Sequence, residues 1–168
     1  MNVRISLALA AVCLLGLTAA TPASAQTSDK AAIRALYQRF NDGFNKKDVD
    51  AIMAAYAPDV FVFDVIPPRQ YVGAPAYRKD WEDLFAANPG PISDTVSDLS
   101  ITVVGPVAYT HCINEGFMTD KDGKQSHLAV RTTDVLRKID GKWLIVQEHN
   151  SVPVDFTTGQ PDMMSKPW

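Results

Sequence analysis

Residues 134–153, D-V-L-R-K-I-D-G-K-W-L-I-V-Q-E-H-N-S-V-P, place the narrowest limits on how this chain can fold. Two apolar, β-branched runs flank Asp140-Gly141, and Asp-Gly between such runs is a strong signal for a tight β-hairpin turn. Side chains alternate between the two faces of a strand. Strict alternation after the turn groups Trp143, Ile145, Gln147, His149 and Ser151 on one face, and Leu144, Val146, Glu148, Asn150 and Val152 on the other. Neither face is consistently polar, so we expect both to be largely covered.

The first 25 residues have the composition of a secretory signal peptide. Arg4 gives a short basic start, residues 5–20 are apolar and mostly small, and Ala23-Ser24-Ala25 matches the A-x-A cleavage pattern. We predict cleavage after Ala25, which would deliver a periplasmic or secreted protein without a stable membrane anchor. An uncleaved anchor is the alternative, but the apolar run is short for a membrane span and Pro22 follows it.

Charge and cysteine content exclude some classes of function. The chain has 16 Lys and Arg residues against 19 Asp and Glu residues and contains no basic block, whereas nucleic-acid-binding surfaces are basic. We therefore expect no nucleic-acid partner. Only Cys112 remains after the predicted cleavage, and we interpret it as a small buried apolar side chain rather than a reactive thiol. The three histidines are too scattered for a recognisable metal spacing, so we expect no metal and no cofactor.

Apolar residues at helical spacing predict three helices in the first half of the chain. Residues 27–44 carry apolar side chains at steps of three and four, which is typical of an amphipathic helix. Asp48 begins a second predicted helix, which ends at Pro58 because proline disrupts a helix interior. A third begins at about Ala74, with Pro75 in its first turn.

The remaining segments predict strands. Short strands are expected at residues 60–65 and 71–72, between the second and third helices. Four longer strands follow, at residues 95–104, 107–119, 126–139 and 142–152. Residues 154–168 lack periodicity and predict a poorly ordered tail. Helices that cover one face of an antiparallel sheet make an α+β domain, and this is the predicted fold class.

The pattern R-K-x-D-G-K-W-x-x-x-x-x-H-x-S-x-P, met from Arg137 to Pro153, adds a resemblance to a known family. It resembles the terminal hairpin of the nuclear transport factor 2-like superfamily, and is most similar to the SnoaL-like branch and to the association domain of calcium/calmodulin-dependent kinase. That superfamily also contains ketosteroid isomerase. The resemblance covers residues 26–153 and implies a cone: a strongly curved antiparallel sheet wrapped around three N-terminal helices, with a pocket at the open end.

Asp64 is the first candidate for chemistry, because it interrupts the apolar strand V-F-V-F-D-V. An ionised carboxylate is costly in apolar surroundings, and one held there suits general-base work. The resemblance implies the same role, since the base of ketosteroid isomerase occupies an equivalent V-x-D position. The alternative is a structural aspartate that caps the Pro67-Pro68 turn or pairs with Arg69.

Asp134 is the second candidate. The resemblance places it in a D-x-x-R context that matches an acid of the isomerase, which stays protonated and donates a hydrogen bond to the oxyanion. Two carboxyl groups of unequal acidity would suit enolisation of a carbonyl compound. The alternative is a cross-strand ion pair with Arg131 or Arg137.

One position departs from the isomerase pattern. The isomerase has a tyrosine on its first helix, in a Q-R-Tyr context, as the main oxyanion donor, and here the context is Gln38-Arg39-Phe40. Losing one such donor typically costs about 10²–10³ in rate, so we do not expect true steroid isomerase activity. Tyr37 and Tyr56 are the candidate substitutes.

His149 and several aromatic residues complete the candidate site. His149 follows Trp143 by six residues, as in the family motif, and some superfamily dehydratases use pocket histidines as acid/base groups. The alternative is a core histidine bonded to Ser151 or to a neighbouring strand. For a flat apolar ligand, the predicted contacts are Phe40, Tyr56, Trp81 and Arg131.

Two functions therefore compete. The first is an exported enzyme that isomerises, dehydrates, cyclises or hydrolyses a small hydrophobic carbonyl compound, with Asp64 as the base and Asp134 or His149 as the polarising group. The second is a non-catalytic module that binds a ligand or associates through its sheet. An enclosed pocket shared by Asp64 and Asp134 would favour the enzyme. We expect a homodimer in either case, formed by the sheet face of Trp143 and Ile145 if the helices leave that face uncovered.

Overall fold

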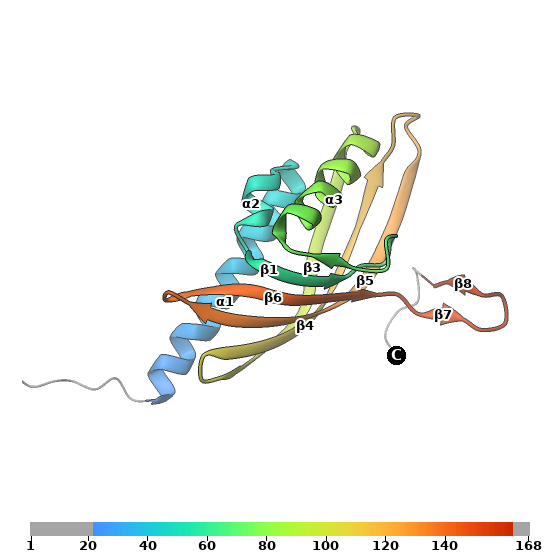
Figure 1. The fold of residues 1–168 in the computed structure, drawn as a ribbon. Helices are drawn as coiled ribbons and strands as arrows, with labels where there is room; N and C mark the ends of the chain where they lie inside the picture. Colours follow the sequence, from blue (N-terminus) through green and yellow to red (C-terminus); the bar gives the residue numbers. More distant parts are fainter. Residues whose placement is uncertain (1–21, 163–168) are drawn as a thin grey trace, which may run out of the picture.

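The computed structural model describes residues 22–162 and contains three helices and eight strands (Figure 1). The helices are α1 (Pro22–Lys46), α2 (Val49–Met53) and α3 (Ala74–Ala87). The strands are β1 (Tyr56–Phe63), β2 (Tyr71–Val72), β3 (Ile92–Val104), β4 (Val107–Thr119), β5 (Gln125–Ile139), β6 (Lys142–Ser151), β7 (Val154–Asp155) and β8 (Gln160–Pro161). The helices lie on one side of a strongly curved sheet (Figure 1), which confirms the predicted α+β cone.

The main sheet has the strand order β2-β1-β6-β5-β4-β3. Neighbouring strands run antiparallel, except that β1 and β6 are parallel. The last long strand, β6, therefore lies between β1, from the first half of the chain, and β5. This parallel pair sets Phe63 opposite His149, so the residues that follow β1 lie beside the end of β6.

The predicted hairpin is confirmed. Strands β5 and β6 pair from Ile139 and Lys142 onward, and the two turn residues between them have positive φ angles, 48° at Asp140 and 79° at Gly141. Glycine accepts such angles without steric cost, and aspartate accepts them more readily than most residues.

Two predicted helix boundaries are wrong. α1 begins at Pro22, five residues before the predicted start, and α2 is a single short segment that ends at Met53. Pro58 does not end a helix but lies exposed within β1. The pairing of β1 with β6 is irregular between Tyr56 and Phe61, and proline is tolerated at such irregularities because no ladder hydrogen bond from its nitrogen is needed there.

The core lies between the helices and the concave face of the sheet. Ile33 and Leu36 of α1 and Tyr77 and Trp81 of α3 are buried in it, as the helical spacing predicts. Trp143 and Ile145 are also buried, with 5% and 2% of their surface exposed, and the Trp143 indole donates to Asp29 of α1 at 3.0 Å. The helices thus cover this face, so the condition for dimerisation through Trp143 and Ile145 is not met, and the homodimer stays a prediction.

A β-bulge in β6 changes which side chains point inward. Leu136 pairs with Ile145, but the next residue back, Val135, pairs with Gln147, so Val146 is an extra residue on β6. Trp143 and Ile145 before the bulge and Glu148 after it are all buried. The strict alternation expected from the sequence, which put Glu148 on the face opposite Trp143, is therefore wrong beyond Ile145.

The two ends of the chain lie partly outside the described range. Residues 1–21, which carry most of the predicted signal peptide, and residues 163–168 are not described. Within the predicted tail, β7 and β8 form a small antiparallel hairpin. No helix within residues 22–162 is long and apolar enough to cross a membrane. Cys112 is buried, as expected, and its burial raises the thiol pKa to about 12.

Candidate functional site

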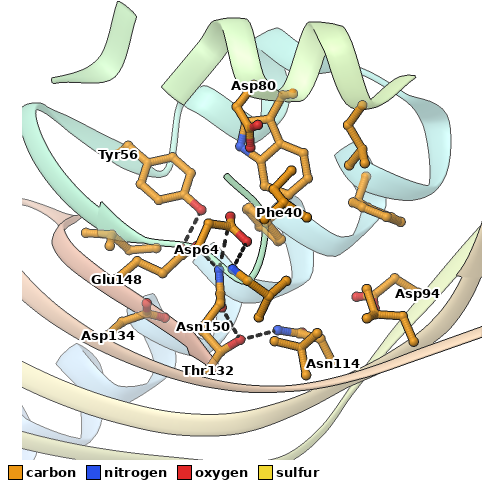
Figure 2. A pocket seen from close by; sticks show the side chains of 18 of the residues that line it. Phe40, Tyr56, Asp64, Asp80, Asp94, Asn114, Thr132, Asp134, Glu148 and Asn150 are labelled. Carbon is orange, nitrogen blue, oxygen red and sulfur yellow. Dashed lines mark hydrogen bonds between the residues drawn. The ribbon is translucent and has the colours of Figure 1, made fainter. Parts of the chain in front are cut away.

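A cavity of about 240 Å³ lies between the helices and the concave face of the sheet (Figure 2). Its lining is mostly apolar, with a cluster of polar side chains. The apolar lining is Leu36, Phe40, Phe44, Val65, Ile66, Trp81, Leu84, Met118, Leu128, Val130 and Ile145. The polar lining is Tyr37, Tyr56, Asp64, Asp80, Asp94, Asn114, Thr132, Asp134, Glu148 and Asn150. An apolar cleft with a few converging polar groups is the usual form of a small-molecule site.

Asp134 of β5 is one of the most deeply buried of these polar residues, with 1% of its surface exposed. Its Oδ2 accepts a hydrogen bond from the Tyr37 hydroxyl, which also contacts the hydroxyl of buried Thr110. Its Oδ1 has no hydrogen-bond partner. Burial raises the pKa of Asp134 well above its usual range, and the nearby charge of Glu148 raises it further. Burial therefore favours the neutral form of the Asp134 carboxyl group, which can donate a hydrogen bond.

The alternative for Asp134, an ion pair with Arg131 or Arg137, is not formed. Both arginines are exposed, and neither appears with Asp134 among the ion pairs of the described residues, which include Arg78–Asp50, Lys79–Asp83 and Lys138–Asp29. Asp134 faces inward because the pleat of β5 turns it to the side opposite Arg131.

Glu148 lies directly opposite Asp134 on β6 and was not among the predicted site residues. It accepts hydrogen bonds from Tyr56 at 2.6 Å, Tyr77 at 2.7 Å and the Asn150 amide at 2.8 Å. Burial raises the pKa of Glu148, although the hydrogen bonds from the two tyrosines act in the opposite direction. Two carboxyl groups on adjacent strands at the same level of a low-dielectric cavity cannot both ionise easily.

Asp64 follows the end of β1 and reaches the same network from the other side (Figure 2). Its Oδ2 lies 3.1 Å from the Tyr77 hydroxyl and 3.5 Å from the Asn150 amide nitrogen. The Tyr77 hydroxyl also contacts Glu148, yet it carries only one hydrogen. It can donate to one carboxylate, and its contact with the other is a hydrogen bond only when that carboxyl is protonated. The Tyr77 hydroxyl therefore links the side chains of Asp64 and Glu148.

A chain of side-chain hydrogen bonds fixes the direction of the Asn150 amide. Asn114 donates to the Thr132 hydroxyl at 2.7 Å, and Thr132 donates to the Asn150 carbonyl oxygen, also at 2.7 Å (Figure 2). The Asn150 amide nitrogen must then point toward the carboxylates. This arrangement holds the polar cluster in one orientation, as a preorganised site requires.

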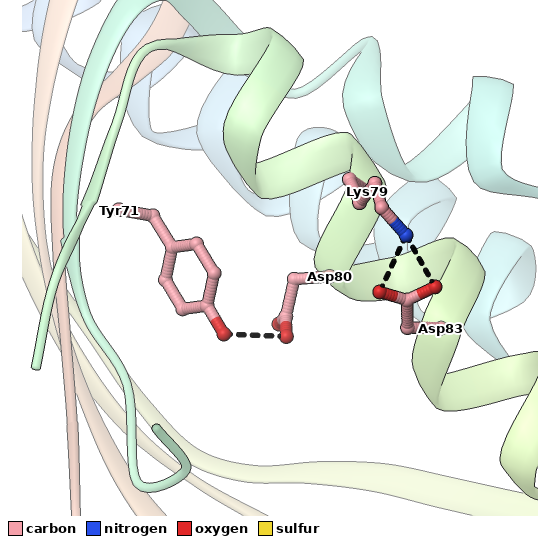
Figure 3. Close-up of polar contacts among 4 residues, drawn as sticks. All are labelled: Tyr71, Lys79, Asp80 and Asp83. Atoms are coloured by element: carbon pink, nitrogen blue, oxygen red, sulfur yellow. Dashed lines mark hydrogen bonds and ion pairs between the residues drawn. The ribbon is translucent and has the colours of Figure 1, made fainter. Parts of the chain in front are cut away.

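Two further carboxyl groups line the cavity. Asp80 of α3 accepts a hydrogen bond from the Tyr71 hydroxyl at 2.6 Å, whereas Lys79 and Asp83 form a separate pair on the exposed side of the helix (Figure 3). Burial raises the pKa of Asp80. It also raises the pKa of Asp94, to about 6, although a hydrogen bond from Asn41 at 2.8 Å opposes this. None of the described residues that line the cavity is Lys, Arg or His.

Most of the predicted site residues meet at this cavity, but two do not. Asp64, Asp134, Phe40, Tyr56 and Trp81 all line it. Arg131 and His149 are exposed and do not line it. His149 instead stacks edge-on against Phe63, with 5.6 Å between ring centroids. Their side chains project from β5 and β6 on the outer face of the sheet. The sequence predicts that both contact the cavity, and neither does.

Phe40, which stands where the isomerase has a tyrosine, has no hydroxyl group, but other tyrosine hydroxyl groups reach the cavity carboxyls. Phe40 lines the cavity without a polar atom and packs edge-on against Trp81, with 5.8 Å between ring centroids. Tyr37, one helical turn earlier, reaches the inward carboxyl of Asp134 instead. Both tyrosines that the sequence offered as substitutes, Tyr37 and Tyr56, have hydroxyl groups bonded to cavity carboxyls.

Comparison with known proteins agrees with this architecture. The family model described as SnoaL-like domain matches residues 33–155. The chain belongs to the SnoaL-like domain family. No curated protein matches this SnoaL-like sequence significantly.

Solved structures place the SnoaL-like domain in the nuclear transport factor 2-like fold. A nuclear transport factor 2-like protein of unknown function from Pseudomonas putida is 29% identical, with a TM-score of 0.76 over 84% of this chain and 98% of that one. A proposed scytalone dehydratase from Novosphingobium aromaticivorans is 17% identical, with a TM-score of 0.69 over 76% and 86%. A ketosteroid isomerase-like protein from Erwinia carotovora is 22% identical, with a TM-score of 0.63 over 72% and 93%. The two less identical structures support the fold and not a shared reaction.

Proposed function

We propose that this protein is an exported, cofactor-free enzyme that removes a proton next to the carbonyl group of a small hydrophobic compound. That step is common to isomerisation, dehydration and cyclisation through an enol, so one site could serve any of these reactions. The observation that carries the proposal is that Asp64 and Asp134 line one largely apolar cavity. The competing interpretation of both residues as members of surface pairs has no support among the described contacts.

In this proposal, the two aspartates have opposite protonation states. The Asp64 carboxylate, which accepts a hydrogen bond from the Val65 backbone N–H and lies 3.1 Å from the Tyr77 hydroxyl, takes the proton from the carbon next to the carbonyl. The negative charge then develops on the carbonyl oxygen. The neutral Asp134 carboxyl donates a hydrogen bond to that oxygen through the oxygen that has no protein partner. The proton held by Asp64 returns to carbon or to a leaving group.

The test is hydrogen–deuterium exchange at the carbon next to the carbonyl of 1-tetralone, a two-ring ketone, followed by NMR in D₂O. We expect the protein to accelerate exchange above the buffer rate. Asp64→Asn should abolish the acceleration, and Asp134→Asn should lower it by about 10²–10³. The control is Asp83→Asn, which removes an exposed carboxyl on α3. Exchange that proceeds equally well in Asp64→Asn would refute the assignment of the base.

A second candidate function is association through the outer face of the sheet. Tyr109 and Val107 of β4 are 51% and 40% exposed, and they alternate with the buried residues Ala108 and Thr110. Exposed aromatic and branched side chains on a sheet favour a protein contact. Sedimentation velocity would detect a homodimer, and Tyr109→Ser should weaken it. A monomer at all accessible concentrations would eliminate this candidate.

A further inference from the structure

We propose that the cavity selects an uncharged compound of one or two rings that carries a hydrogen-bond acceptor, and that it rejects the matching carboxylate. This inference rests on the proposed function, because it names the class of carbonyl compound on which Asp64 and Asp134 would act. Three features of the cavity support it: its size, its charge, and two buried polar atoms without partners.

The size of the cavity limits the number of rings. An apolar cavity of about 150 Å³ binds benzene, and drug-sized ligands occupy sites of about 300–1,000 Å³. The cavity here, at about 240 Å³, lies between these values. Its enclosed part suits a ligand larger than benzene and smaller than a compound of four fused rings.

The charge of the lining argues against an anionic ligand. Five carboxyl groups border the cavity: Asp64, Asp80, Asp94, Asp134 and Glu148. Among the described residues that line the cavity, no Lys, Arg or His could pair with a carboxylate or phosphate on the ligand. An anion would therefore meet like charge in a region of low dielectric, or would force a carboxyl to take up another proton. An uncharged ligand meets neither obstacle.

Two unpaired polar atoms indicate that the ligand carries an acceptor. Trp81 Nε1 and Asp134 Oδ1 are buried and have no hydrogen-bond partner, on side chains that are 8% and 1% exposed. Both residues line the cavity. Buried polar groups nearly always have partners, and an indole N–H can only donate. A carbonyl or hydroxyl oxygen on the ligand would supply the missing acceptor for Trp81, and the neutral Asp134 carboxyl offers a second donor.

Calorimetric titration of the purified protein with three matched probes tests the inference. The probes are tetralin, which has no polar group, 1-tetralone, which adds a carbonyl, and 1,2,3,4-tetrahydro-1-naphthoate, which adds a carboxylate. At neutral pH we expect the ketone to bind at least about tenfold more tightly than the carboxylate, a difference of about 1.4 kcal/mol. A carboxylate that binds as tightly as the ketone, or a ketone that fails to bind at millimolar concentration, would overturn the inference.

Two variants show whether the named atoms cause the selectivity. Trp81→Phe removes the indole N–H and part of the apolar lining but keeps an aromatic ring, so it should weaken binding of the ketone by a larger factor than it weakens binding of tetralin. An equal loss for both probes would assign Trp81 to packing alone and would refute its role as a donor. Glu148→Gln keeps the side-chain shape and removes a carboxyl, so it should reduce the discrimination against the carboxylate. If either variant fails to fold, the three probes on the unmodified protein still decide the question.

Exchange of 1-tetralone hydrogens, measured on the same samples, separates this inference from the proposed function. Selective binding of the ketone without accelerated exchange would uphold the ligand class and refute the catalytic proposal. Accelerated exchange together with equal binding of the ketone and the carboxylate would uphold the catalytic proposal and refute the ligand class.

Discussion

The inner and outer faces of β5 and β6 differ in almost every chemical property, although adjacent residues build them. On the inner face, Asp134 and Glu148 are 1% and 5% exposed and bonded to tyrosines. On the outer face, Arg131 and His149 are exposed to solvent. Glu148 and His149 are sequence neighbours, yet only the first lines the cavity. The orientation of a strand residue, more than its identity, thus decides whether it can take part in chemistry here.

The largest expected effect is on stability, and it comes from introducing a lysine on the inner face, compared with a lysine at the neighbouring position on the outer face. Glu148→Lys places a cation among three hydrogen-bond donors in a buried site, and we expect it to destabilise the protein by more than about 4 kcal/mol. His149→Lys, at the exposed neighbour, should change stability by less than about 0.5 kcal/mol. Urea denaturation measures both values. Similar losses for the two variants would contradict the difference between the faces.

The pH dependence of stability provides a second contrast. The pKa of Asp94 is raised from its ordinary 3.8 to about 6 in the folded protein, so folding favours its protonated form. Its contribution is complete below about pH 4 and is lost as the pH rises through 6. Relative to Asp94→Asn, which stays neutral, the natural protein should therefore lose on the order of 2 kcal/mol between these pH values.

Denaturation series at several pH values would check this prediction. The control is Asp122→Asn, in the exposed turn between β4 and β5, which should follow the natural protein throughout. A curve for Asp94→Asn that runs parallel to that of the natural protein across this window would show that Asp94 ionises as freely when folded as when unfolded.

Removal of the Tyr37 hydroxyl group tests the buried hydrogen bond between Tyr37 and Asp134. Tyr37→Phe leaves Asp134 without its donor, and an unsatisfied buried polar group costs about 1–3 kcal/mol. The matched substitution on the outer face is Tyr109→Phe, at a side chain that is 51% exposed. We expect a clear fall in melting temperature for the first variant and almost none for the second. Equal melting temperatures would mean that the Tyr37–Asp134 contact adds nothing to stability.

The smallest expected effects are those of substitutions on the outer face of the sheet on the affinity for a ligand in the cavity. Arg131→Ala and His149→Ala should leave the affinity for 1-tetralone unchanged, because neither side chain lines the cavity. Titration calorimetry would detect a change of twofold or more. A larger loss of affinity in either variant would show that the residue contributes to the site, as the sequence predicts.

Local signals in the sequence were sufficient for most of the fold. The Asp140-Gly141 turn, the helical spacing of apolar residues and the composition of the strands correspond to β5–β6, α1 and α3. Asp64 was recognisable because an acid interrupts an apolar strand. The parallel pairing of β1 with β6 has no local signal, since it depends on contacts between residues that are far apart in the chain.

The errors at the site have a physical explanation. Strict alternation places Glu148 on the wrong face because the sequence carries no signal for the bulge at Val146, and a bulge is set by strand curvature rather than by one residue type. The signal that marks Asp64, an acid within an apolar strand, is weaker at Glu148, because Gln147, His149 and Asn150 beside it are polar. The motif that contains His149 and the residue type of Arg131 do not report which face of the sheet a residue occupies.

The parallel pairing of β1 with β6 also has a consequence for how the protein folds. Asp64 and Asn150 approach each other across 86 positions of sequence, and β6 lies between β1 and β5 in the finished sheet. The helices and the β3–β4–β5 meander can form from nearby segments, but β1 has no long neighbour until β6 has been synthesised. Such long-range contacts form slowly because a large loop must close first. The polar cluster is therefore assembled late, and a chain that stops before residue 142 would retain Asp64 and Asp134 without a cavity to hold them together.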